Sequence, residues 1–224
     1  TADQATLYLD TSGEPLYVRG HKLAKVGAPL KENLAAGILR LSGWQPGTAL
    51  LDPMCGSGTF LLEAALMAHD IAPGLERKFG FLRLNNFDAT LWQKLLAEAE
   101  ARKRPVVPQP IFGSDISQDQ VERARQNLAA AGMHACVQLE CADLLQRNAP
   151  VPEGVLVANP PYGVRLEEAE WLEAFYPRLG DALKQRFAGW RCYFISADPQ
   201  LPKLISLKAS KRTPLFNGAL ECRL

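Results

Sequence analysis

Hydrophobic residues in the middle of the 224-residue chain alternate between short unbroken runs and longer runs with helical spacing. Short apolar runs bounded by turn residues predict buried strands, and apolar residues three or four positions apart predict amphipathic helices. The predicted strands are 48–51, 111–114, 135–140, 155–158 and 192–196. The predicted helices between them are 59–70, 118–131 and 168–187. Strands that alternate with helices predict an α/β fold, in which helices cover both faces of a mostly parallel sheet.

The beginning of the chain has a different pattern. Apolar and polar residues alternate over residues 5–19 around a central turn, which predicts a hairpin. Residues 30–41 then show helical spacing, with Pro29 at the start and a glycine after the end. We therefore expect residues 1–45 to form a hairpin and a helix that lead into a main domain over residues 46–224.

A second hairpin is predicted close to the end of the sequence. An Asn-Gly pair stands between apolar residues within 215–220, and this dipeptide is the strongest short hairpin signal. The last two strands are expected to be antiparallel, with Leu220, Cys222 and Leu224 on one face. Together with the five internal strands they predict a seven-stranded, mostly parallel sheet with an antiparallel last strand.

One stretch interrupts the alternation of strands and helices. In a compact dinucleotide-binding unit, an acidic residue follows the glycine loop by about 20 positions. Here Gly58 and Asp115 are separated by 57 positions (115 − 58), so residues from 71 to about 109 are predicted to be an insertion that contains a helix over 88–103. Such an insertion either shapes a binding site or only covers hydrophobic surface.

Composition excludes several classes of protein. The chain has 25 Lys+Arg against 24 Asp+Glu, so its net charge of +1 does not indicate a polyanionic partner. The sequence contains no run of 18 apolar residues, so no membrane-spanning helix is predicted. Thr1 is not followed by a secretory leader, and we expect a processed or excised piece of a cytoplasmic protein. Five cysteines without a C-x-x-C pair indicate reduced thiols, and they argue against a disulfide scaffold and a zinc or other metal site.

The first candidate site lies between the strand at 48–51 and the helix at 59–70, where the chain reads Asp52-Pro53-Met54-Cys55-Gly56-Ser57-Gly58-Thr59. The two glycines let the backbone turn sharply and approach a ligand closely. The helix start behind them offers free N–H groups. No lysine follows the glycines, so the segment is not a P-loop. A carboxylate at Asp52 would repel phosphate and suits a cationic or hydroxyl-bearing ligand.

Two further acids follow the next two predicted strands. Asp115 stands where an acid accepts hydrogen bonds from ribose hydroxyls. It could instead cap the following helix, but Ser117 is the better cap and would leave Asp115 free. Asp143 suits the amino group of an adenine, or it is an ordinary loop aspartate. Acids at three successive strand ends favour a ligand, because ligands bind at the carboxyl ends of such sheets.

The fourth strand is followed by Asn159-Pro160-Pro161-Tyr162. The two prolines fix the backbone and remove two donors. They leave carbonyl oxygens beside the Asn159 amide oxygen and next to an aromatic ring. This arrangement offers rigid acceptors and a stacking surface, and it suits a planar group that carries an NH₂. The alternative is a loop that is merely stiffened by proline.

The motifs at 52–59 and 159–162 together resemble those of the S-adenosylmethionine-dependent amino-methyltransferases. Further segments make the resemblance more specific, and they are 19–22, 28–36, 71–75, 79–81 and 215–224. With them the chain resembles, over nearly its whole length and including the insertion, the bacterial THUMP-containing guanine-N2 methyltransferases of large-subunit ribosomal RNA (RlmL type). The resemblance implies a Rossmann-like methyltransferase fold, and an RNA-binding THUMP module upstream of this chain.

The resemblance also implies which residues bind the cofactor, S-adenosylmethionine. Asp52 would lie near the methionine ammonium, Asp115 would hold the ribose and Asp143 would hold the adenine amino group. The positions implied for the cofactor are Pro29, Leu30, Asp52, Pro53, Cys55, Gly56, Gly58, Thr59, Asp115, Ile116, Asp143, Leu144 and Asn159.

The implied catalytic residues are Asn159, Pro160, Pro161 and Tyr162. The Asn159 amide oxygen and the Pro160 carbonyl would hold the target amine, whose lone pair is otherwise delocalised into the ring. A neutral acceptor agrees with catalysis by placement rather than by a strong base. A paired base cannot reach such a pocket, so the guanine would be flipped out, with Tyr162 as its stacking partner.

Several alternatives stay open on the sequence alone. The same motif serves adenine, cytosine and a protein glutamine amide, and a transfer-RNA guanine is the nearest rival substrate. Another possible function is that of a non-catalytic module that binds S-adenosylmethionine or RNA. An NAD-dependent oxidoreductase is disfavoured, because Leu61 stands where its third glycine would be needed.

A basic run close to the end of the chain has no assigned role. It consists of Lys203, Lys208, Lys211 and Arg212. A solvated strand edge protected by charge is at least as good an interpretation as a contact with RNA.

Overall fold

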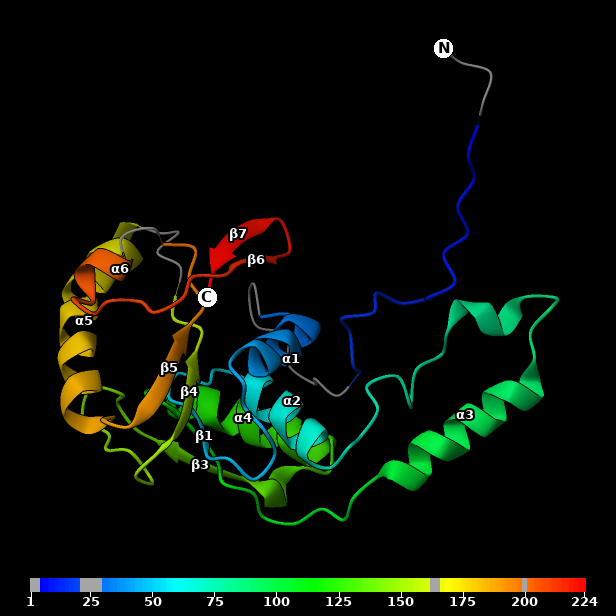
Figure 1. Cartoon of the computed structure of the whole chain (residues 1–224), viewed down its shortest axis with the longest axis horizontal. Helices are drawn as coiled ribbons and strands as arrows, with labels where there is room; N and C mark the ends of the chain where they lie inside the picture. Colours follow the sequence, from blue (N-terminus) through cyan, green and yellow to red (C-terminus); the bar gives the residue numbers. More distant parts are fainter. Residues whose placement is uncertain (1–4, 21–29, 162–165, 199–200) are drawn as a thin grey trace.

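A computed structural model describes residues 5–20, 30–161, 166–198 and 201–224 (Figure 1). Its centre is a five-stranded parallel sheet in the order β3-β2-β1-β4-β5. All five internal strands predicted from the sequence are confirmed. Their bounds are β1 Leu50–Asp52, β2 Ile111–Asp115, β3 Val137–Cys141, β4 Gly154–Ala158 and β5 Trp190–Phe194.

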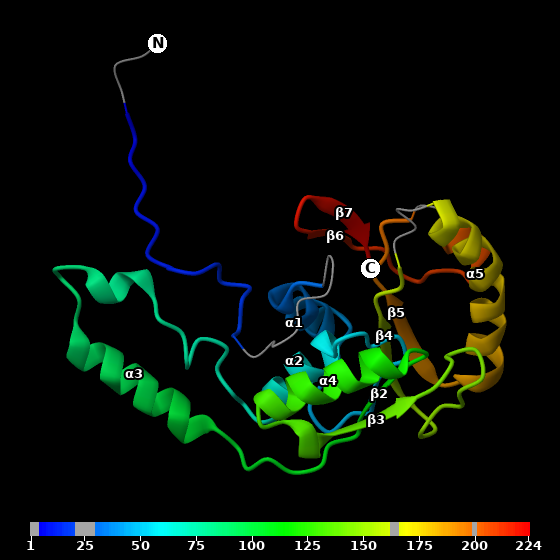
Figure 2. The same cartoon turned by 180° about the vertical axis from the view of Figure 1, so that it is seen from behind.

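Helices cover both faces of the sheet, as Figures 1 and 2 show from opposite sides. One face packs against α1 Glu32–Leu41, α2 Thr59–Ala68 and α4 Gln118–Ala130, and the other against α5 Leu166–Arg186 and α6 Leu201–Leu204. Neighbouring strand residues point to opposite faces. Leu50 therefore joins the first hydrophobic cluster and Leu51 the second. Burial on both faces explains why these strands are short unbroken apolar runs.

The strand order places a topological switch point beside β1. The chain runs outward from β1 to β2 and β3 on one side, and then returns to β4 and β5 on the other. Loops that leave the carboxyl ends of β1 and β4 diverge there, which leaves a crevice that such folds use for ligands. Every candidate motif but the basic run follows the carboxyl end of a strand of this sheet.

The predicted seven-stranded sheet is wrong in strand count. The last strands, β6 Pro214–Asn217 and β7 Leu220–Arg223, pair antiparallel as expected but form their own two-stranded sheet. A single bridge between Ser196 and Arg223 links this hairpin to the chain just after β5. The expected apolar face is also incomplete, because Cys222 is buried but Leu220 is exposed. Apolar alternation could not reveal that the ladder stops after one bridge.

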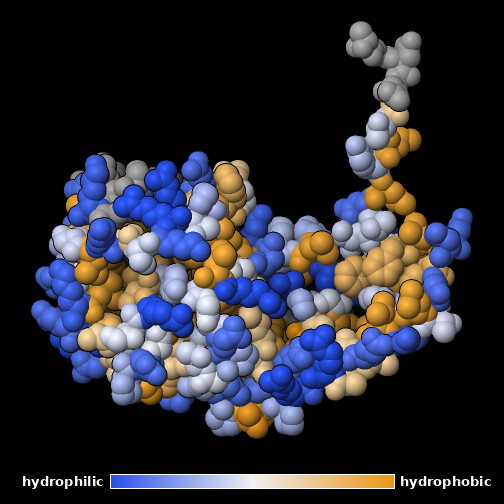
Figure 3. All heavy atoms as spheres, viewed as in Figure 1, coloured by the Kyte–Doolittle hydropathy of each residue, from blue (hydrophilic) through white to orange (hydrophobic). Residues whose placement is uncertain are grey.

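The predicted N-terminal hairpin is also wrong. Residues 5–20 contain no strand, and Leu7, Tyr8 and Leu9 are exposed. Figure 3 shows hydrophobic residues gathered over this segment and over the neighbouring insertion. Strand propensity alone does not form a hairpin when neither strand gains a hydrophobic surface to pack on.

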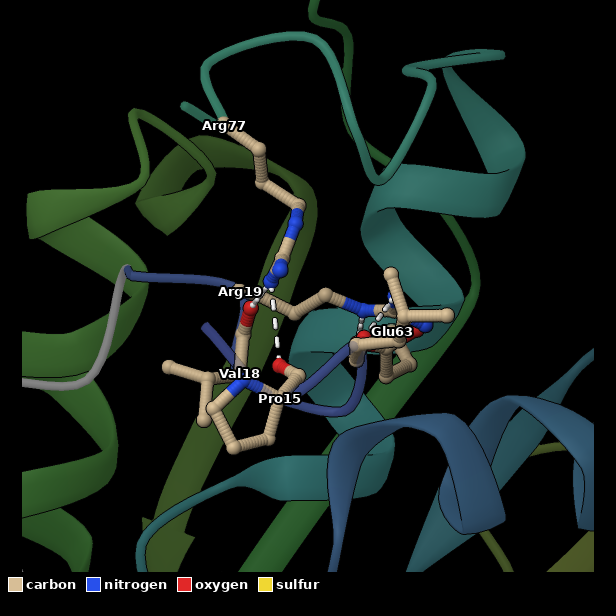
Figure 4. A network of polar contacts seen from close by, with 6 residues as sticks. Pro15, Val18, Arg19, Glu63 and Arg77 are labelled. Carbon is tan, nitrogen blue, oxygen red and sulfur yellow. Dashed lines mark hydrogen bonds and ion pairs between the residues drawn. The ribbon is translucent and has the colours of Figure 1, made fainter. Parts of the chain in front are cut away.

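Polar contacts hold residues 14–19 in place (Figure 4). The Arg77 guanidinium donates hydrogen bonds to the carbonyl oxygens of Glu14, Pro15 and Val18. Arg19 Nε lies 3.1 Å from Glu63 Oε1 on α2, and both side chains are almost buried. Residues 14–19 are thus fixed to both the insertion and the main domain.

The insertion contains the predicted helix. The helix α3 spans Ala89–Arg102, and the side chain of Asp88 caps it by accepting a hydrogen bond from the Leu91 N–H at 2.9 Å. A short 3₁₀ helix at Gly80–Arg83 precedes it, and another at His134–Cys136 precedes β3. In both cartoons α3 lies to the side of the sheet, away from β4 and β5.

The buried ion pair makes a testable contribution to stability. Arg19→Met removes a cation that lies 3.1 Å from the buried Glu63 carboxylate, and we expect the free energy of unfolding to fall by about 3 kcal/mol in urea titrations. Arg102→Met is the matched control, because its ion pair with Asp70 is exposed to solvent and its loss should change the free energy of unfolding much less. An equal decrease in the free energy of unfolding in the two variants would contradict a stabilising role of the buried ion pair.

Candidate active site at the carboxyl end of the sheet

The glycine loop after β1 is held by contacts to β2 and α4. The Asp115 carboxylate accepts hydrogen bonds from the Gly56 N–H at 2.9 Å and the Ser117 N–H at 3.0 Å. The Cys55 N–H donates to the Ser114 carbonyl at 2.8 Å. These bonds fix the path of a loop whose backbone must stay open to a ligand.

The sequence predicts that Asp115 is free for a ligand. In the structure, the Asp115 carboxylate is instead hydrogen-bonded to two backbone N–H groups. Ser117 occupies the cap position of α4, but its side chain makes no capping hydrogen bond. Asp115 accepts a hydrogen bond from the N–H of Ser117 itself. A carboxylate has about four acceptor positions, so two remain for ligand hydroxyls.

The glycines are required by backbone conformation. Gly56 has φ +50° and Gly58 has φ +82°, values that side chains with a Cβ rarely adopt. A Cβ on Gly58 would also lie 3.1 Å from the Ala124 Cβ on α4. Around Gly56 no atom lies within 4 Å of such a Cβ, so a ligand can approach its backbone. Thr59, the first residue of α2, is buried directly behind this loop.

Asp52 ends β1 as a buried carboxylate with 2% exposure. Its Oδ1 accepts a hydrogen bond from the Met54 N–H at 3.3 Å. Burial raises the pKa of Asp52 well above its usual value, and the negative charge of Asp115 raises it further against the effect of the Met54 bond. A buried acid of this kind favours a cationic ligand, which restores the ionised form.

Cys55 and Pro53 are structural neighbours of this acid. Burial raises the pKa of the Cys55 thiol, and the charges of Asp52 and Asp115 raise it further. The thiol therefore stays protonated and is not a nucleophile. Pro53 is buried, and its carbonyl accepts a hydrogen bond from Ser114 Oγ at 3.5 Å.

The ends of β2 and β3 bring two more predicted residues together. Ala142 N–H donates to the Asp115 carbonyl at 3.0 Å, which places Asp143 beside the end of β2. The Asp143 carboxylate accepts from the Leu145 N–H at 2.9 Å and lines a cavity of about 810 Å³. Ile116 is 74% exposed at the same edge, whereas Leu144 is buried in the core. An exposed isoleucine there provides an apolar surface for a planar ring.

Asn159 follows the end of β4, on the other side of β1. The register pairs Leu51 with Leu156, so Asn159 stands level with the chain that follows Asp52. Its Oδ1 is buried and accepts no hydrogen bond from any described residue. A buried acceptor without a donor is costly, which indicates a place for a ligand's donor. Pro160 is buried beside it and Pro161 is exposed.

Three of the predicted site residues cannot be assigned to the described site. Two fall outside the described residues, and the third is part of the hydrophobic core. Pro29 and Tyr162 fall outside the described residues. Leu30 is buried in the hydrophobic cluster that also contains Cys55.

Sequence reasoning missed two buried polar residues near the site, and the first of them holds the glycine loop. The Asn127 Nδ2 on α4 donates to the Ser57 carbonyl at 3.0 Å, and the residue is fully buried. A signal existed, because Asn127 lies on the helix face of the buried Val121, Ala124 and Leu128.

The second missed residue is Arg147, which lines the cavity beside Asp143. Its Nε lies 2.9 Å from Glu140 Oε1, and its side chain is only 8% exposed. Burial lowers the pKa of this guanidinium, against the effect of Glu140. Nothing in the sequence distinguishes it from an ordinary surface arginine.

A family model described as the RMKL-like methyltransferase domain matches residues 19–224. The chain belongs to this methyltransferase family. Among the described residues, no cluster of His, Cys, Asp or Glu could hold a metal ion, and no helix is long and apolar enough to cross a membrane.

Relatives of this RMKL-like domain include larger proteins. The ribosomal RNA large subunit methyltransferase K/L of Desulfotalea psychrophila (strain LSv54 / DSM 12343) is 44% identical over 232 residues. That match covers 100% of this chain but only 32% of the relative, so the chain spans about a third of the length of that relative.

Solved structures show the same architecture. SMU.472 in complex with SAH has a TM-score of 0.87 and 34% identity, over 95% of this chain and 55% of that one. A predicted N6-adenine-specific DNA methylase from Listeria monocytogenes str. 4b F2365 has a TM-score of 0.84 and 33% identity, over the same 95% and 55%. The fold is thus a Rossmann-like methyltransferase fold.

The raised pKa of Asp52 predicts a pH-dependent cost in stability. The folded state binds a proton that the unfolded state releases, so stability falls as pH rises from about 4 through the raised pKa. We expect Asp52→Asn to stabilise the ligand-free domain at pH 7 by roughly 1 kcal/mol or more. The gain should shrink toward pH 4 in urea titrations. Glu153→Gln, at an exposed carboxylate, is the control; an unchanged gain at every pH would contradict the buried charge as its cause.

Proposed function

We propose that this domain transfers a methyl group from S-adenosylmethionine to the exocyclic N2 amine of a flipped-out guanine in large-subunit ribosomal RNA. Family membership and the K/L relatives support an RNA methyltransferase. The observation that carries the proposal is the buried Asn159 Oδ1, which has no hydrogen-bond donor among the described residues. It stands at the switch point beside a glycine loop and a buried acid.

The residues at the site fit this cofactor. Asp52 is a buried carboxylate that gains from a cation, as the methionine ammonium would provide. Asp115 has acceptor positions left for ribose hydroxyls, and Asp143 has them for an amino group. The exposed Ile116 side chain would lie against the adenine ring. The related SMU.472 was crystallised with SAH, the demethylated product form of the same cofactor.

The protein's contribution to the chemistry is placement. S-adenosylmethionine supplies an already activated methyl group on a sulfonium. Asn159 Oδ1 and the Pro160 carbonyl would each accept a hydrogen bond from the target NH₂, which turns its lone pair toward the methyl group. Both acceptors are neutral and fixed, so they orient the nitrogen without an added charge that must be desolvated. The leaving proton passes to solvent after transfer.

A second candidate is the N6 amine of adenine. It is supported by the name of the related Listeria methylase, and the same acceptor pair would suit that amine. A transfer-RNA guanine is a further candidate of the same chemistry. The relatives' greater length also supports a proposal that RNA capture is shared with an upstream THUMP module.

Calorimetry tests the cofactor, and methyl transfer tests the substrate. We expect micromolar binding of S-adenosylmethionine and none of NADH. With radiolabelled cofactor, unmodified large-subunit ribosomal RNA should be labelled at guanine N2 on nucleoside analysis. Label in N6-methyladenine would indicate adenine as the substrate. Label in transfer RNA alone would indicate a transfer-RNA guanine. Cofactor binding without transfer to any of these acceptors would favour a non-catalytic module.

Asn159→Ala tests the acceptor pair. We expect methyl transfer to fall by a factor of about 100 or more, the usual size of a lost group of this kind, with cofactor affinity changed less than threefold or so. Asn159→Asp, which keeps an acceptor but adds a charge, should recover only part of the rate. Near-normal turnover of the alanine variant would exclude Asn159 as the residue that orients the amine.

A further inference from the structure

The end of the chain carries an unusual concentration of positive charge. Residues 201–224 contain five Lys and Arg and one Glu, a net charge of +4. The other 200 residues contain 20 Lys and Arg and 23 Asp and Glu, a net charge of −3. The near-neutral total therefore hides a charge separation, and the C-terminal part carries a net positive charge that attracts a polyanion.

The basic residues of this part are exposed and close together in sequence. Residues 208–212, with Lys208, Lys211 and Arg212, are all exposed. None of these three cations makes an ion pair with a described residue. Three exposed cations elsewhere differ in this respect, because Lys94, Arg125 and Lys184 each pair with an acid on their own helix.

The basic stretch is connected to the catalytic edge by backbone pairing. Ile195 N–H donates to the Ala158 carbonyl at 3.0 Å, and Ser196 and Arg223 exchange two bonds of 3.0 and 2.8 Å. Thr213, which follows Arg212, exchanges two bonds of 2.9 Å with Leu224. Three strand spacings of about 4.8 Å put Thr213 roughly 14 Å from Asn159-Pro160. Figures 1 and 2 both show the β6–β7 hairpin beside the end of β5 and next to α1.

The hairpin next to this stretch carries an exposed aromatic ring. Phe216 is 64% exposed and pairs across the ladder with Glu221, on the same face as Arg223. The opposite face packs inward through the buried Cys222. An aromatic ring beside cations is the usual means of binding single-stranded nucleic acid, because bases stack on the ring while cations contact phosphates.

We propose that the outer face of the β6–β7 hairpin and residues 208–212 form a binding surface for single-stranded RNA that flanks the target nucleotide. Lys208, Lys211 and Arg212 contact phosphates, and Phe216 stacks on an unpaired base. The inference rests on the proposed function for its substrate class. It adds a surface that holds RNA outside the catalytic pocket.

Binding measurements with the 224-residue chain and unmodified large-subunit ribosomal RNA test the surface. The triple variant Lys208→Ala/Lys211→Ala/Arg212→Ala should raise the RNA Kd at least about tenfold, and lower the slope of log affinity against log salt by about 2. Phe216→Ala should raise the Kd by roughly five- to 100-fold with the slope unchanged, because stacking releases no counterions. The control triple variant, Lys94→Ala/Arg125→Ala/Lys184→Ala, removes the same charge and should change neither quantity appreciably.

Steady-state methyl transfer separates this surface from the pocket. We expect both surface variants to raise KM for RNA, with kcat at saturating RNA and cofactor affinity within about twofold of the unaltered chain. If the unaltered chain transfers methyl groups but the basic triple and its control behave alike, the surface is overturned and the proposed function stands. If the unaltered chain binds RNA through this surface but transfers nothing, the proposed function fails and the surface stands.

Discussion

The bond between the Asp115 carboxylate and the Gly56 N–H is the constraint on which the site depends. It joins two residues separated by 59 positions, across an insertion that leaves the sheet after α2 and returns before β2. Without it, the open glycine loop would be held mainly by the Cys55–Ser114 backbone bond and by Asn127 on α4. Gly56 and Asp115 both lie outside the insertion, so the bond fixes the ends of β1 and β2 whatever the length of the insertion.

The same tie has an electrostatic cost. Fixing Asp115 beside β1 places its charge near the buried Asp52 and raises the pKa of that acid further. A protein optimised for stability alone would not keep a buried carboxylate without a cation. The arrangement is reasonable if a positively charged ligand neutralises it, since ligand binding then recovers energy that folding has given up.

Strand ends could be predicted from sequence because two-sided burial leaves an unmistakable apolar run, and polar residues that stop such a run mark the edge of the sheet. Asp52, Asp115, Asp143 and Asn159 were found in this way. Pairing partners could not be predicted. Residues 5–19 alternate as a strand would, and the β6–β7 hairpin alternates as well, but only contacts distant in sequence decide which of them joins a ladder. Asn127 was missed because one polar residue on an apolar helix face is easily taken for a tolerated exception.

The strand order distributes charge along the carboxyl edge of the sheet. Reading outward from β3, the edge carries Asp143, Asp115 and Asp52, then the neutral Asn159 after β4 and Asp198 after β5, and then the basic residues around the hairpin. A cationic cofactor and a polyanionic substrate prefer opposite ends of such an edge, and they would meet at β4. The residue that stands there should carry no charge, because a carboxylate would repel the incoming RNA and an ammonium would repel the sulfonium. An asparagine at this position carries no charge that would repel either partner, which agrees with the proposed role of Asn159 as the acceptor that orients the amine.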